Sequence, residues 1–260
     1  MDAQVTVYIP FYNRKQYLLE TIDTVYNQSY QNWRMILIDD CSTDGAIDVI
    51  SHYLKDERIQ LISNQTNLGK SKSLNKALNM TNTPFAIELD SDDWFFPWTL
   101  EFLVNEAKKH SEDIAVFSGN IMIVEGERHR QKKQVVTGRL YKDKYDFLLG
   151  NRVVWPRFYR TSALKKVGGW PTDDHYKGNH GVDDLRVLLK LIEHFSFHWS
   201  NKLLYKVRLH DFNISNERNV CAEVKEWAVR DALKRWGDLY EPTFIIDSEG
   251  WCHVDKLIPK

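Results

Sequence analysis

Acidic side chains cluster at Asp90, Asp92 and Asp93, directly after the largely apolar segment Phe85–Leu89. Carboxylates this close repel one another, so the cluster requires either water or a cation to offset the repulsion. Clustered carboxylate oxygens suit Mg²⁺ or Mn²⁺, ions that usually carry the phosphates of a nucleotide. The sequence therefore indicates a metal and phosphate site here, with a solvated acidic loop as the alternative interpretation.

Two further polar clusters follow apolar segments earlier in the chain. Tyr12–Arg14 come after the strand predicted at Val5–Ile9, which Pro10 is expected to end, and Asp39–Asp40 come after Met35–Ile38. Ligands of parallel α/β sheets bind at the carboxyl ends of the strands. We therefore expect the three polar clusters to contribute to one shared site.

The elements that must position these clusters alternate between strand and helix. Apolar runs and the 3.6-residue period predict strands at 5–9, 35–38, 59–62, 85–89 and 115–117, and helices at 15–27, 47–54, 71–80 and 99–110. Successive β-α units of this spacing imply a parallel sheet covered by helices on both faces.

The second half of the chain is less regular. A hairpin is predicted at 121–136, with a basic tip at 125–133 that we interpret as a solvated turn rather than an anionic acceptor contact. The remaining predicted features are an extended segment at 152–159, a short helix capped by Thr161–Ala163, a turn at 168–171, helices at 183–194 and 220–236, and two short strands within 244–257.

Composition limits the class of protein. Hydrophobic residues make up 43% of the 260, enough for a sizeable core, and the net charge of −1 argues against a general nucleic-acid binder. The three cysteines include no CxxC pair, so they are neither a disulfide framework nor a zinc site and fit a reducing compartment. No apolar stretch approaches the roughly 20 residues that span a bilayer, and the N-terminus lacks a signal-peptide pattern. We therefore expect a soluble cytoplasmic protein.

Several of these segments, taken in order, resemble the motifs of family 2 glycosyltransferases. The members resembled have the GT-A fold, use nucleotide-sugar donors and invert the anomeric configuration. The resemblance covers roughly residues 5–215 and rests on the ordered set, because any one motif is weak. The matching segments are Val7–Asn13, Ile38–Gly45, Asn67–Gly69 continuing to Asn75, Leu89–Asp93 with the DxD metal motif, and Val167–Trp170 followed by Val182–Asp184.

The resemblance implies an α/β fold of the GT-A type, with a Rossmann-like, mostly parallel sheet flanked by helices and a smaller mixed acceptor-side region. It divides the chain into a nucleotide-sugar-binding half at 1–118, an acceptor-binding half at 119–215, and a C-terminal helix and tail at 216–260.

On the nucleotide side, the resemblance implies that Asp40, with or without Asp39, accepts the imide N–H of uracil or thymine, since a carboxylate accepts but cannot donate. Helix capping is the alternative for both acids. Relatives often carry arginine where this chain has Leu74, and Lys70 or Lys72 could substitute for it. The set implied for the donor nucleotide is Pro10, Tyr12, Asn13, Asp39, Asp40, Asn67, Gly69, Lys72, Asp90 and Ser91.

On the metal side, Asp90 would reach the ribose hydroxyls, while Asp92, Asp93 and His210 would hold Mg²⁺ or Mn²⁺. Which of Asp92 and Asp93 contacts the ion is left open, and a structural role is the alternative for His210. The ion would bridge the diphosphate oxygens and offset charge on the leaving nucleoside diphosphate.

Asp184 is the general base that the resemblance implies, taking the proton of an acceptor hydroxyl as its oxygen attacks the anomeric carbon opposite the diphosphate. The alternative, shared with Asp183, is an acid at a helix N-terminus, where the helix dipole favours negative charge. Asp183, where relatives usually carry glutamate, would bind the acceptor together with Trp155 and Trp170. Core packing is the alternative for both tryptophans.

These implications predict a metal-dependent inverting glycosyltransferase that moves a sugar from a UDP- or dTDP-sugar to a carbohydrate, lipid-linked or other hydroxyl acceptor, in cell-surface polysaccharide or glycolipid assembly. A sugar nucleotidyltransferase is the first alternative, although Phe11–Arg14 stands where such enzymes carry a Gly-rich loop. The second is a non-catalytic nucleotide-binding subunit of an assembly complex, which the intact acids argue against. Neither a nucleic-acid partner nor a transmembrane segment is expected, whereas contact with the inner membrane face and homo-oligomerisation are left open.

Overall fold

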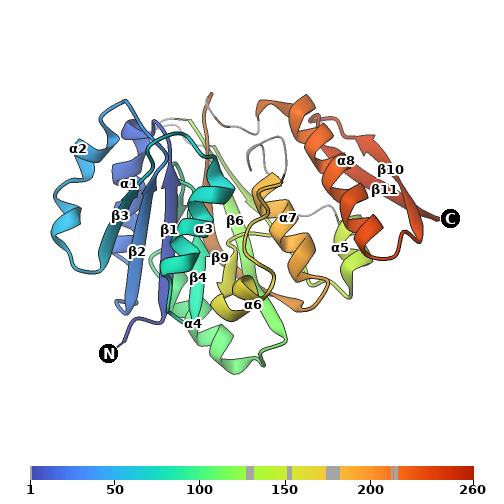
Figure 1. The fold of residues 1–260 in the computed structure, drawn as a ribbon, viewed down its shortest axis with the longest axis horizontal. Coiled ribbons are helices and arrows are strands. Elements are labelled where there is room, and N and C mark those ends of the chain that lie inside the picture. The colour runs from blue at the N-terminus through green and yellow to red at the C-terminus, as the bar shows by residue number, and fades with distance from the viewer. Residues whose placement is uncertain (1, 127–131, 151–153, 174–181, 212, 214–215) are drawn as a thin grey trace.

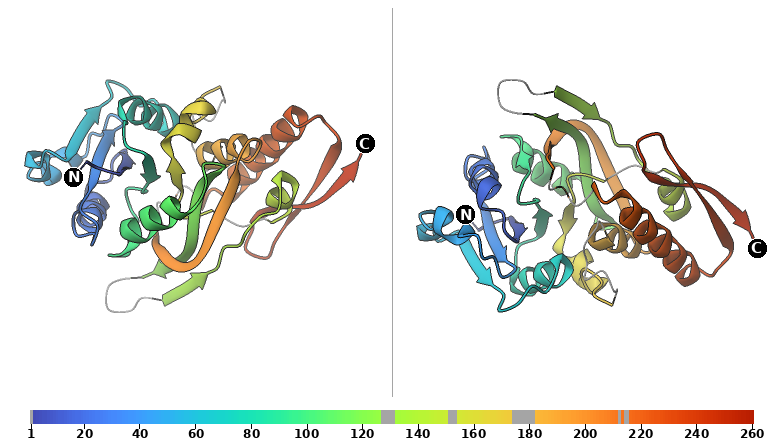
Figure 2. Two further views of the ribbon diagram at one scale, coloured as in Figure 1. Left: turned by 90° about the horizontal axis from the view of Figure 1, so that it is seen from below. Right: turned by 90° about the horizontal axis from the view of Figure 1, so that it is seen from above.

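The computed structural model contains a large curled sheet flanked by helices and a small second sheet at the C-terminus (Figures 1 and 2). It describes residues 2–126, 132–150, 154–173, 182–211, 213 and 216–260. Within these residues, every helix is too short or too polar to cross a bilayer.

The N-terminal part of the main sheet is parallel, as predicted. Its strands lie side by side in the order β3 (Ile59–Ser63), β2 (Trp33–Asp39), β1 (Val5–Phe11) and β4 (Phe85–Glu88). Every residue of β1 and β4 is buried, as expected for strands covered on both faces. Pro10 does not end β1, because its fixed φ is compatible with extended backbone, and it pairs with Ile38 in the ladder.

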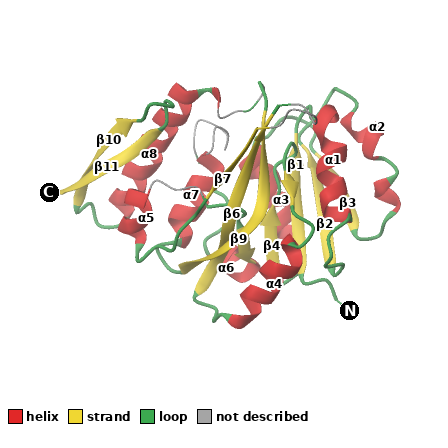
Figure 3. Ribbon diagram, turned by 180° about the vertical axis from the view of Figure 1, so that it is seen from behind, coloured by secondary structure: helices red, strands yellow, loops and turns green. Residues whose placement is uncertain are grey.

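Helices cover both faces of this parallel part (Figures 1 and 3). Side chains alternate along β1, so Val5, Val7 and Ile9 pack on one face while Tyr8 packs on the other. The first face is covered by α1 (Lys15–Tyr26), α2 (Ala46–Ile50) and α4 (Thr99–Lys109), and the second by α3 (Lys70–Met80), α6 (Thr161–Lys166) and α7 (Val182–Leu191). The helix predicted at 47–54 is broken into α2 and the 3-10 turn η1 (Tyr53–Lys55).

The rest of the main sheet is mixed, as predicted for the acceptor-side region. β8 (Phe158–Arg160) lies antiparallel between β4 and β6 (Ile114–Glu125), and β9 (Ser196–Leu209) runs parallel to β6. β5 (Trp94–Phe95) and β7 (Lys132–Val136) pair antiparallel with β9 and β6. Because β8 reverses direction on both of its sides, β4, β6 and β9 all end at the same edge of the sheet.

Some predicted elements have different limits in the structure. The strand predicted at 115–117 and the first arm of the predicted hairpin form one strand, β6, which pairs with β7 from Ile121 and Val136 onward. The hairpin is therefore confirmed, although Arg128 and Arg130 of its basic tip lie outside the described residues. β9 and α5 (Lys144–Gly150) were not predicted, because polar residues interrupt the apolar alternation of β9 and α5 is short.

The C-terminal segment forms α8 (Arg218–Arg235) and an antiparallel pair of β10 (Tyr240–Ile246) and β11 (Cys252–Pro259), which confirms the helix and the two strands predicted there. α8 packs beside α7 (Figure 2). The predicted cap of α6 is wrong: Arg160 is the N-cap residue, and in the described structure the Oγ1 of Thr161 is buried without a hydrogen-bond partner.

Candidate active site

Polar side chains from distant parts of the chain meet at the carboxyl-end edge of the main sheet. Asp90, Asp92 and Asp93 follow β4, whereas Arg208 and His210 lie at the end of β9. β4 and β9 run in the same direction through the two antiparallel pairings of β8, so their carboxyl ends share one edge. This topology brings together residues that are more than a hundred positions apart in the sequence.

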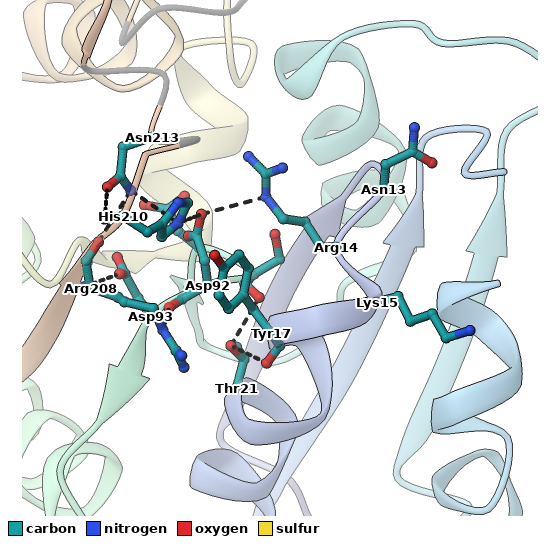
Figure 4. A network of polar contacts seen from close by, with 12 residues as sticks. Asn13, Arg14, Lys15, Tyr17, Thr21, Asp92, Asp93, Arg208, His210 and Asn213 are labelled. Atoms are coloured by element: carbon teal, nitrogen blue, oxygen red, sulfur yellow. Dashed lines mark hydrogen bonds and ion pairs between the residues drawn. The ribbon is translucent and has the colours of Figure 1, made fainter. Parts of the chain in front are cut away.

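Asp92 and His210 form the centre of this cluster (Figure 4). Nε2 of His210 lies 3.0 Å from Oδ2 of Asp92, and Nε of Arg14 lies 3.5 Å from the same oxygen. The imidazole stacks on Tyr17 with ring centroids 4.5 Å apart, and the His210 backbone N–H donates to Oδ1 of Asn213 at 2.6 Å. The pair could therefore offer one oxygen and one nitrogen ligand to a divalent ion, a set that fits Mn²⁺ and, less closely, the oxygen-preferring Mg²⁺.

Asp93 is turned away from that pair. Its Oδ1 accepts the backbone N–H of Arg208 at 2.8 Å, and the residue is 4% exposed. Burial, followed by the charges of Asp92 and Asp90, holds the pKa of its carboxyl well above the usual range. Of the two adjacent acids, Asp92 is therefore the one that lies beside His210, while Asp93 holds the end of β9 by its hydrogen bond with the backbone of Arg208.

The ammonium group of Lys70 joins two of the predicted site residues. Its Nζ lies 2.8 Å from Oδ1 of Asp90 and 2.9 Å from Oδ2 of Asp183, with Oε2 of Glu88 at 3.9 Å. Burial disfavours the charged form, yet these three carboxylates raise the pKa of Lys70 well above its usual value. Asp183 is 3% exposed, which argues against its predicted contact with an acceptor. Lys72, the lysine in the predicted nucleotide set, is exposed on the same helix.

A second cation, Arg157, contacts the predicted base. Its Nη1 lies 2.9 Å from Oδ2 of Asp184, and its Nη2 lies 3.4 Å from Oε2 of Glu88 and 3.7 Å from Oδ2 of Asp90. Glu88 is buried within β4 and accepts the hydroxyl of Tyr159 at 2.7 Å. The buried guanidinium of Arg157 thus links Asp90, predicted to bind the ribose, to Asp184, predicted to be the general base.

The carboxyl of Asp184 keeps access to solvent, with 21% of its side chain exposed. It lies in the first turn of α7 beside Asp183. Burial raises its pKa to about 7, the charge of Arg157 opposes that rise, and the charge of Asp183 adds to it. A carboxyl with a pKa near neutrality can exchange protons at physiological pH, as a general base must.

Asp40 is engaged by the loop that precedes α3. Its Oδ1 accepts the N–H of Leu68 and Nδ2 of Asn64, both at 2.8 Å, and its Oδ2 accepts the N–H of Gly69 at 2.9 Å. Gly69 has a φ of +85°, a conformation that a side chain would strain, so the loop needs both the glycine and its carboxylate anchor. These three hydrogen bonds argue against imide recognition by Asp40, and they place its carboxylate at the N-terminus of α3 rather than at the helix that follows Asp44.

The other residues predicted for the nucleotide differ in their surroundings. Asp39 is 4% exposed, and its Oδ1 accepts the N–H of Ser42 at 2.9 Å, which is a turn contact. Oδ1 of Asn13 accepts the N–H of Thr43 at 2.8 Å in the same turn. Pro10, Gly69 and Ser91 are buried, whereas Tyr12, Asn67 and Lys72 are exposed.

An open hollow of about 710 Å³ adjoins the Asp92–His210 pair. Arg14 and Tyr17 line this hollow and also contact Asp92 and His210. Asn13 and Lys15 point away from Asp92 (Figure 4). The lining residues are Asn13, Arg14, Lys15, Gln16, Tyr17, Asp44 and Val49. Its size is sufficient for part of a nucleotide.

The two tryptophans predicted at the acceptor have different environments. Trp170 is 1% exposed, its Nε1 donates to Oε1 of Glu88 at 3.1 Å, and two tyrosine rings pack edge-on against it. Protein encloses the ring, so the prediction that Trp170 stacks on a sugar is wrong and core packing is correct. Trp155 is half-buried and lies parallel to Tyr205, with ring centroids 6.0 Å apart.

Three residues of the network, Glu88, Arg157 and Tyr205, are absent from the predicted site. Glu88 is a lone charge in an apolar strand, and Arg157 is a charge within the aromatic run Trp155–Tyr159. Because a buried charge needs a partner, that pattern could have marked both. Tyr205, whose hydroxyl accepts the backbone N–H of Asp90 at 3.1 Å, lies in the strand that sequence patterning misses.

A curled α/β sheet flanked by helices, with carboxylates and a histidine at the carboxyl ends of its strands, matches the GT-A fold that the sequence predicts. The chain belongs to glycosyl transferase family 2, whose family model matches residues 6–168.

Named relatives agree with this membership. The chain is 37% identical to the putative teichuronic acid biosynthesis glycosyltransferase TuaG of Bacillus subtilis over 115 residues, 44% of this chain and 44% of TuaG. It is 26% identical to chondroitin synthase of Escherichia coli over 246 residues, 90% of this chain and 33% of that protein. The chain thus spans less than half the length of these curated relatives.

Solved structures confirm the predicted fold class. The S. aureus TarS fragment 1–349 in complex with UDP-GlcNAc has a TM-score of 0.70 at 19% identity, over 90% of this chain and 67% of that one. The mannosyltransferase PcManGT of Pyrobaculum calidifontis in complex with GDP-Man and Mn²⁺ has a TM-score of 0.66 at 18% identity, over 90% of this chain and 65% of that one. At these identities the likeness concerns the fold.

Proposed function

We propose that the chain is a metal-dependent inverting glycosyltransferase that moves a sugar from a UDP- or dTDP-sugar to a hydroxyl acceptor. The observation that carries this proposal is the position of Arg157, which lies 2.9 Å from Asp184 and 3.7 Å from Asp90. Asp184, the proposed base, and Asp90, the acid proposed at the ribose, therefore share one cation. Asp92, the proposed metal ligand, follows Asp90 by two residues. A donor held at Asp90 and Asp92 would therefore have its sugar on the side of Asp184.

In the proposed reaction, a carboxylate oxygen of Asp184 takes the proton of the acceptor hydroxyl while that hydroxyl oxygen attacks the anomeric carbon. The new glycosidic C–O bond forms on the face opposite the diphosphate as the bond to the diphosphate oxygen breaks, so the configuration inverts. Arg157 holds Oδ2 of Asp184 and fixes the direction of its carboxylate. A positioned base contributes about 10² to 10⁴ in rate.

Asp92 and His210 would hold the divalent ion. These two side chains fit a divalent ion because their ligand atoms, Oδ2 of Asp92 and Nε2 of His210, lie 3.0 Å apart. In addition, burial and the neighbouring acids Asp92 and Asp90 raise the pKa of Asp93. An ion at Asp92 would offset the repulsion between these neighbouring acids. When bound, the ion would stabilise the negative charge that develops on the leaving nucleoside diphosphate.

The comparisons support the donor class and the biological context that we propose. TarS was solved with UDP-GlcNAc and PcManGT with GDP-Man and Mn²⁺, so both bind nucleoside diphosphate sugars. One relative is named for teichuronic acid biosynthesis and another for chondroitin synthesis, which favours polysaccharide assembly for this chain. The preference for uracil or thymine rests on the resemblance alone, because Asp40 is engaged by its own loop.

A donor panel tests the proposal. The protein is mixed with UDP-, dTDP- and GDP-sugars in Mn²⁺, Mg²⁺ or EDTA, and both melting temperature and nucleoside diphosphate release are measured. We expect a metal-dependent rise in melting temperature with one UDP- or dTDP-sugar, since a ligand of the folded state stabilises it, together with slow release of the diphosphate. The Asp184→Asn variant should keep the rise and lose the release.

Each alternative has its own outcome in this panel. Donor binding without release in any metal would favour a non-catalytic nucleotide-binding subunit. Pyrophosphate release from a nucleoside triphosphate would favour a sugar nucleotidyltransferase. A response to GDP-sugars alone would refute the proposed base preference while leaving the reaction class intact.

A further inference from the structure

A second cluster of metal-binding side chains lies apart from the proposed donor site and consists of Glu106, His110 and His198. Glu106 lies in the last turns of α4, His110 directly follows α4, and His198 lies near the start of β9. One ligand atom from each residue lies within 4.8 Å of the others. Because Arg208 marks the other end of β9, this cluster and the donor site occupy opposite ends of that strand.

The distances within the cluster approach those of a metal site. Oε1 of Glu106 lies 3.3 Å from Nε2 of His110 and 3.7 Å from Nε2 of His198. Ligands bound at about 2.0–2.1 Å in a tetrahedron stand roughly 3.4 Å apart, so small movements would bring these three atoms onto one ion. The side chains are 18%, 32% and 21% exposed, which leaves a route for an ion and room for a water ligand.

The surrounding structure holds the three residues in place. Glu106 and His110 are four residues apart at the end of α4, which puts them on one helix face. Nη2 of Arg160 donates to the carbonyl of His110 at 2.7 Å and also to two further carbonyls of that turn. His198 is fixed from the other side, because it pairs with Phe117 in the ladder between β9 and β6.

Among the described residues, the side chains of Lys109 and Ser200 also touch the cluster. Nζ of Lys109 lies 3.1 Å from Oε2 of Glu106, the oxygen that does not face the histidines. Oγ of Ser200 lies 3.2 Å from Nε2 of His198. The lysine thus helps to aim Oε1 at both imidazoles, and the serine hydroxyl is a weak partner that an ion would displace.

We propose that Glu106, His110 and His198 bind a zinc-class divalent ion that ties α4 to β9. Two imidazole nitrogens and one carboxylate oxygen form a ligand set that Zn²⁺ accepts, whereas Mg²⁺ prefers oxygen ligands. The ion would join elements distant in sequence and lie away from the proposed donor site, so we expect it to stabilise the packing of α4 on β9 rather than to act in the transfer. Counting cysteines gives no sign of this site, because its ligands are histidines and a glutamate.

Zn²⁺ alone is the probe, added to the EDTA-treated and dialysed protein. We expect one Zn²⁺ per chain at this site and a melting temperature raised by at least about 3 °C at saturation. Both effects should be lost in His198→Gln and in His110→Gln. If His198→Gln does not fold, His110→Gln carries the test, because His110 is the more exposed of the two histidines.

Two controls separate this site from other histidine–carboxylate pairs. Asp92→Asn removes the proposed donor-site ligand and should keep the Zn²⁺ response. His253→Gln breaks a pair in which Nε2 lies 2.7 Å from Asp247 and should also keep it. The proposal is overturned by a wild-type protein that does not respond to Zn²⁺, or by a response that survives both His110→Gln and His198→Gln.

Discussion

Arg157 and Asp184, 27 positions apart in the chain, form an ion pair with 2.9 Å between Nη1 and Oδ2. The side chain of Arg157 is 2% exposed, so water screens its charge weakly. The same guanidinium also contacts Glu88 and Asp90, which means that three acids share one buried cation. The proton affinity of Asp184 therefore depends on residues that an acceptor would never touch.

Replacing Asp184 with asparagine should separate binding from chemistry. The amide has the same size but cannot take a proton, so we expect kcat to fall by about 10² to 10⁴ while donor affinity stays near the wild-type value. Diphosphate release measures the first quantity and calorimetric titration of the donor measures the second. Asp238→Asn, at an exposed ion pair with Lys260, is the matched control and should change neither. Wild-type turnover in Asp184→Asn would refute the assignment of the base.

The reaction should slow in acid. A base acts only when unprotonated, and the pKa of Asp184 is raised to about 7, so kcat should fall about tenfold per pH unit below that value and level off above it. Arg157→Lys loses the planar fork and weakens the attraction that favours the carboxylate, so the descending limb should move to higher pH. The measurement is kcat against pH at saturating donor and metal. A wild-type limb near pH 4 would show that the active base has an ordinary carboxyl pKa.

The raised pKa of Asp184 also makes the stability of the fold depend on pH. The pKa of Asp184 rises from 3.8 to about 7 on folding, so between these values the folded state binds more protons than the unfolded state. The contribution of this group to the free energy of unfolding therefore falls as pH rises through that window, by an amount on the order of a few kcal/mol. Thermal melts of wild type and Asp184→Asn should show their difference moving in favour of the variant from pH 5 to pH 8. A difference independent of pH would contradict the raised pKa.

Sequence patterning predicted the parallel half of the sheet well because β1, β2 and β4 are short apolar runs ended by polar residues. The ordered motifs also selected Asp92 and Asp184 as candidates, the resemblance added His210, and the structure places His210 beside Asp92. β9 was not predicted because lysine, arginine, serine and asparagine side chains along it obscure the period of two. The position of His210 beside Asp92 depends on that strand, so the contact could not be derived before the topology was known.

The roles of individual acids are less visible in sequence than their presence. Asp40 and Asp92 both follow apolar strands, yet one anchors Leu68 and Gly69 while the other lies beside His210. Lys70 and Lys72 are two positions apart on α3, and only Lys70 faces the acids. Such differences follow from loop geometry and helix phase, which composition and spacing do not determine.

Glu88 and Arg157 should show strong coupling in stability. Removing either charge takes one buried ionic partner from the other, at a cost of up to roughly 3–5 kcal/mol, whereas removing both should cost less than the sum. The variants are Glu88→Gln, Arg157→Met and the double substitution, compared by denaturant unfolding. Glu241→Gln and Arg230→Met, from an exposed pair, form the control cycle and should couple by less than about 1 kcal/mol. Additive effects at the buried pair would show that the two charges act independently.

Adjacent Asp92→Asn and Asp93→Asn substitutions decide which acid holds the ion. Asp92 is placed beside His210, so its loss should weaken Mn²⁺ activation at least about tenfold, a change of roughly 1.4 kcal/mol in binding. Asp93 accepts the backbone N–H of Arg208, a bond that the carbonyl oxygen of asparagine can keep, so Asp93→Asn should leave the Mn²⁺ requirement within about threefold of wild type. The concentration of Mn²⁺ that gives half-maximal diphosphate release is the quantity to compare. The reverse order of effects would move the ion to Asp93 and require its carboxylate to turn out of the protein interior.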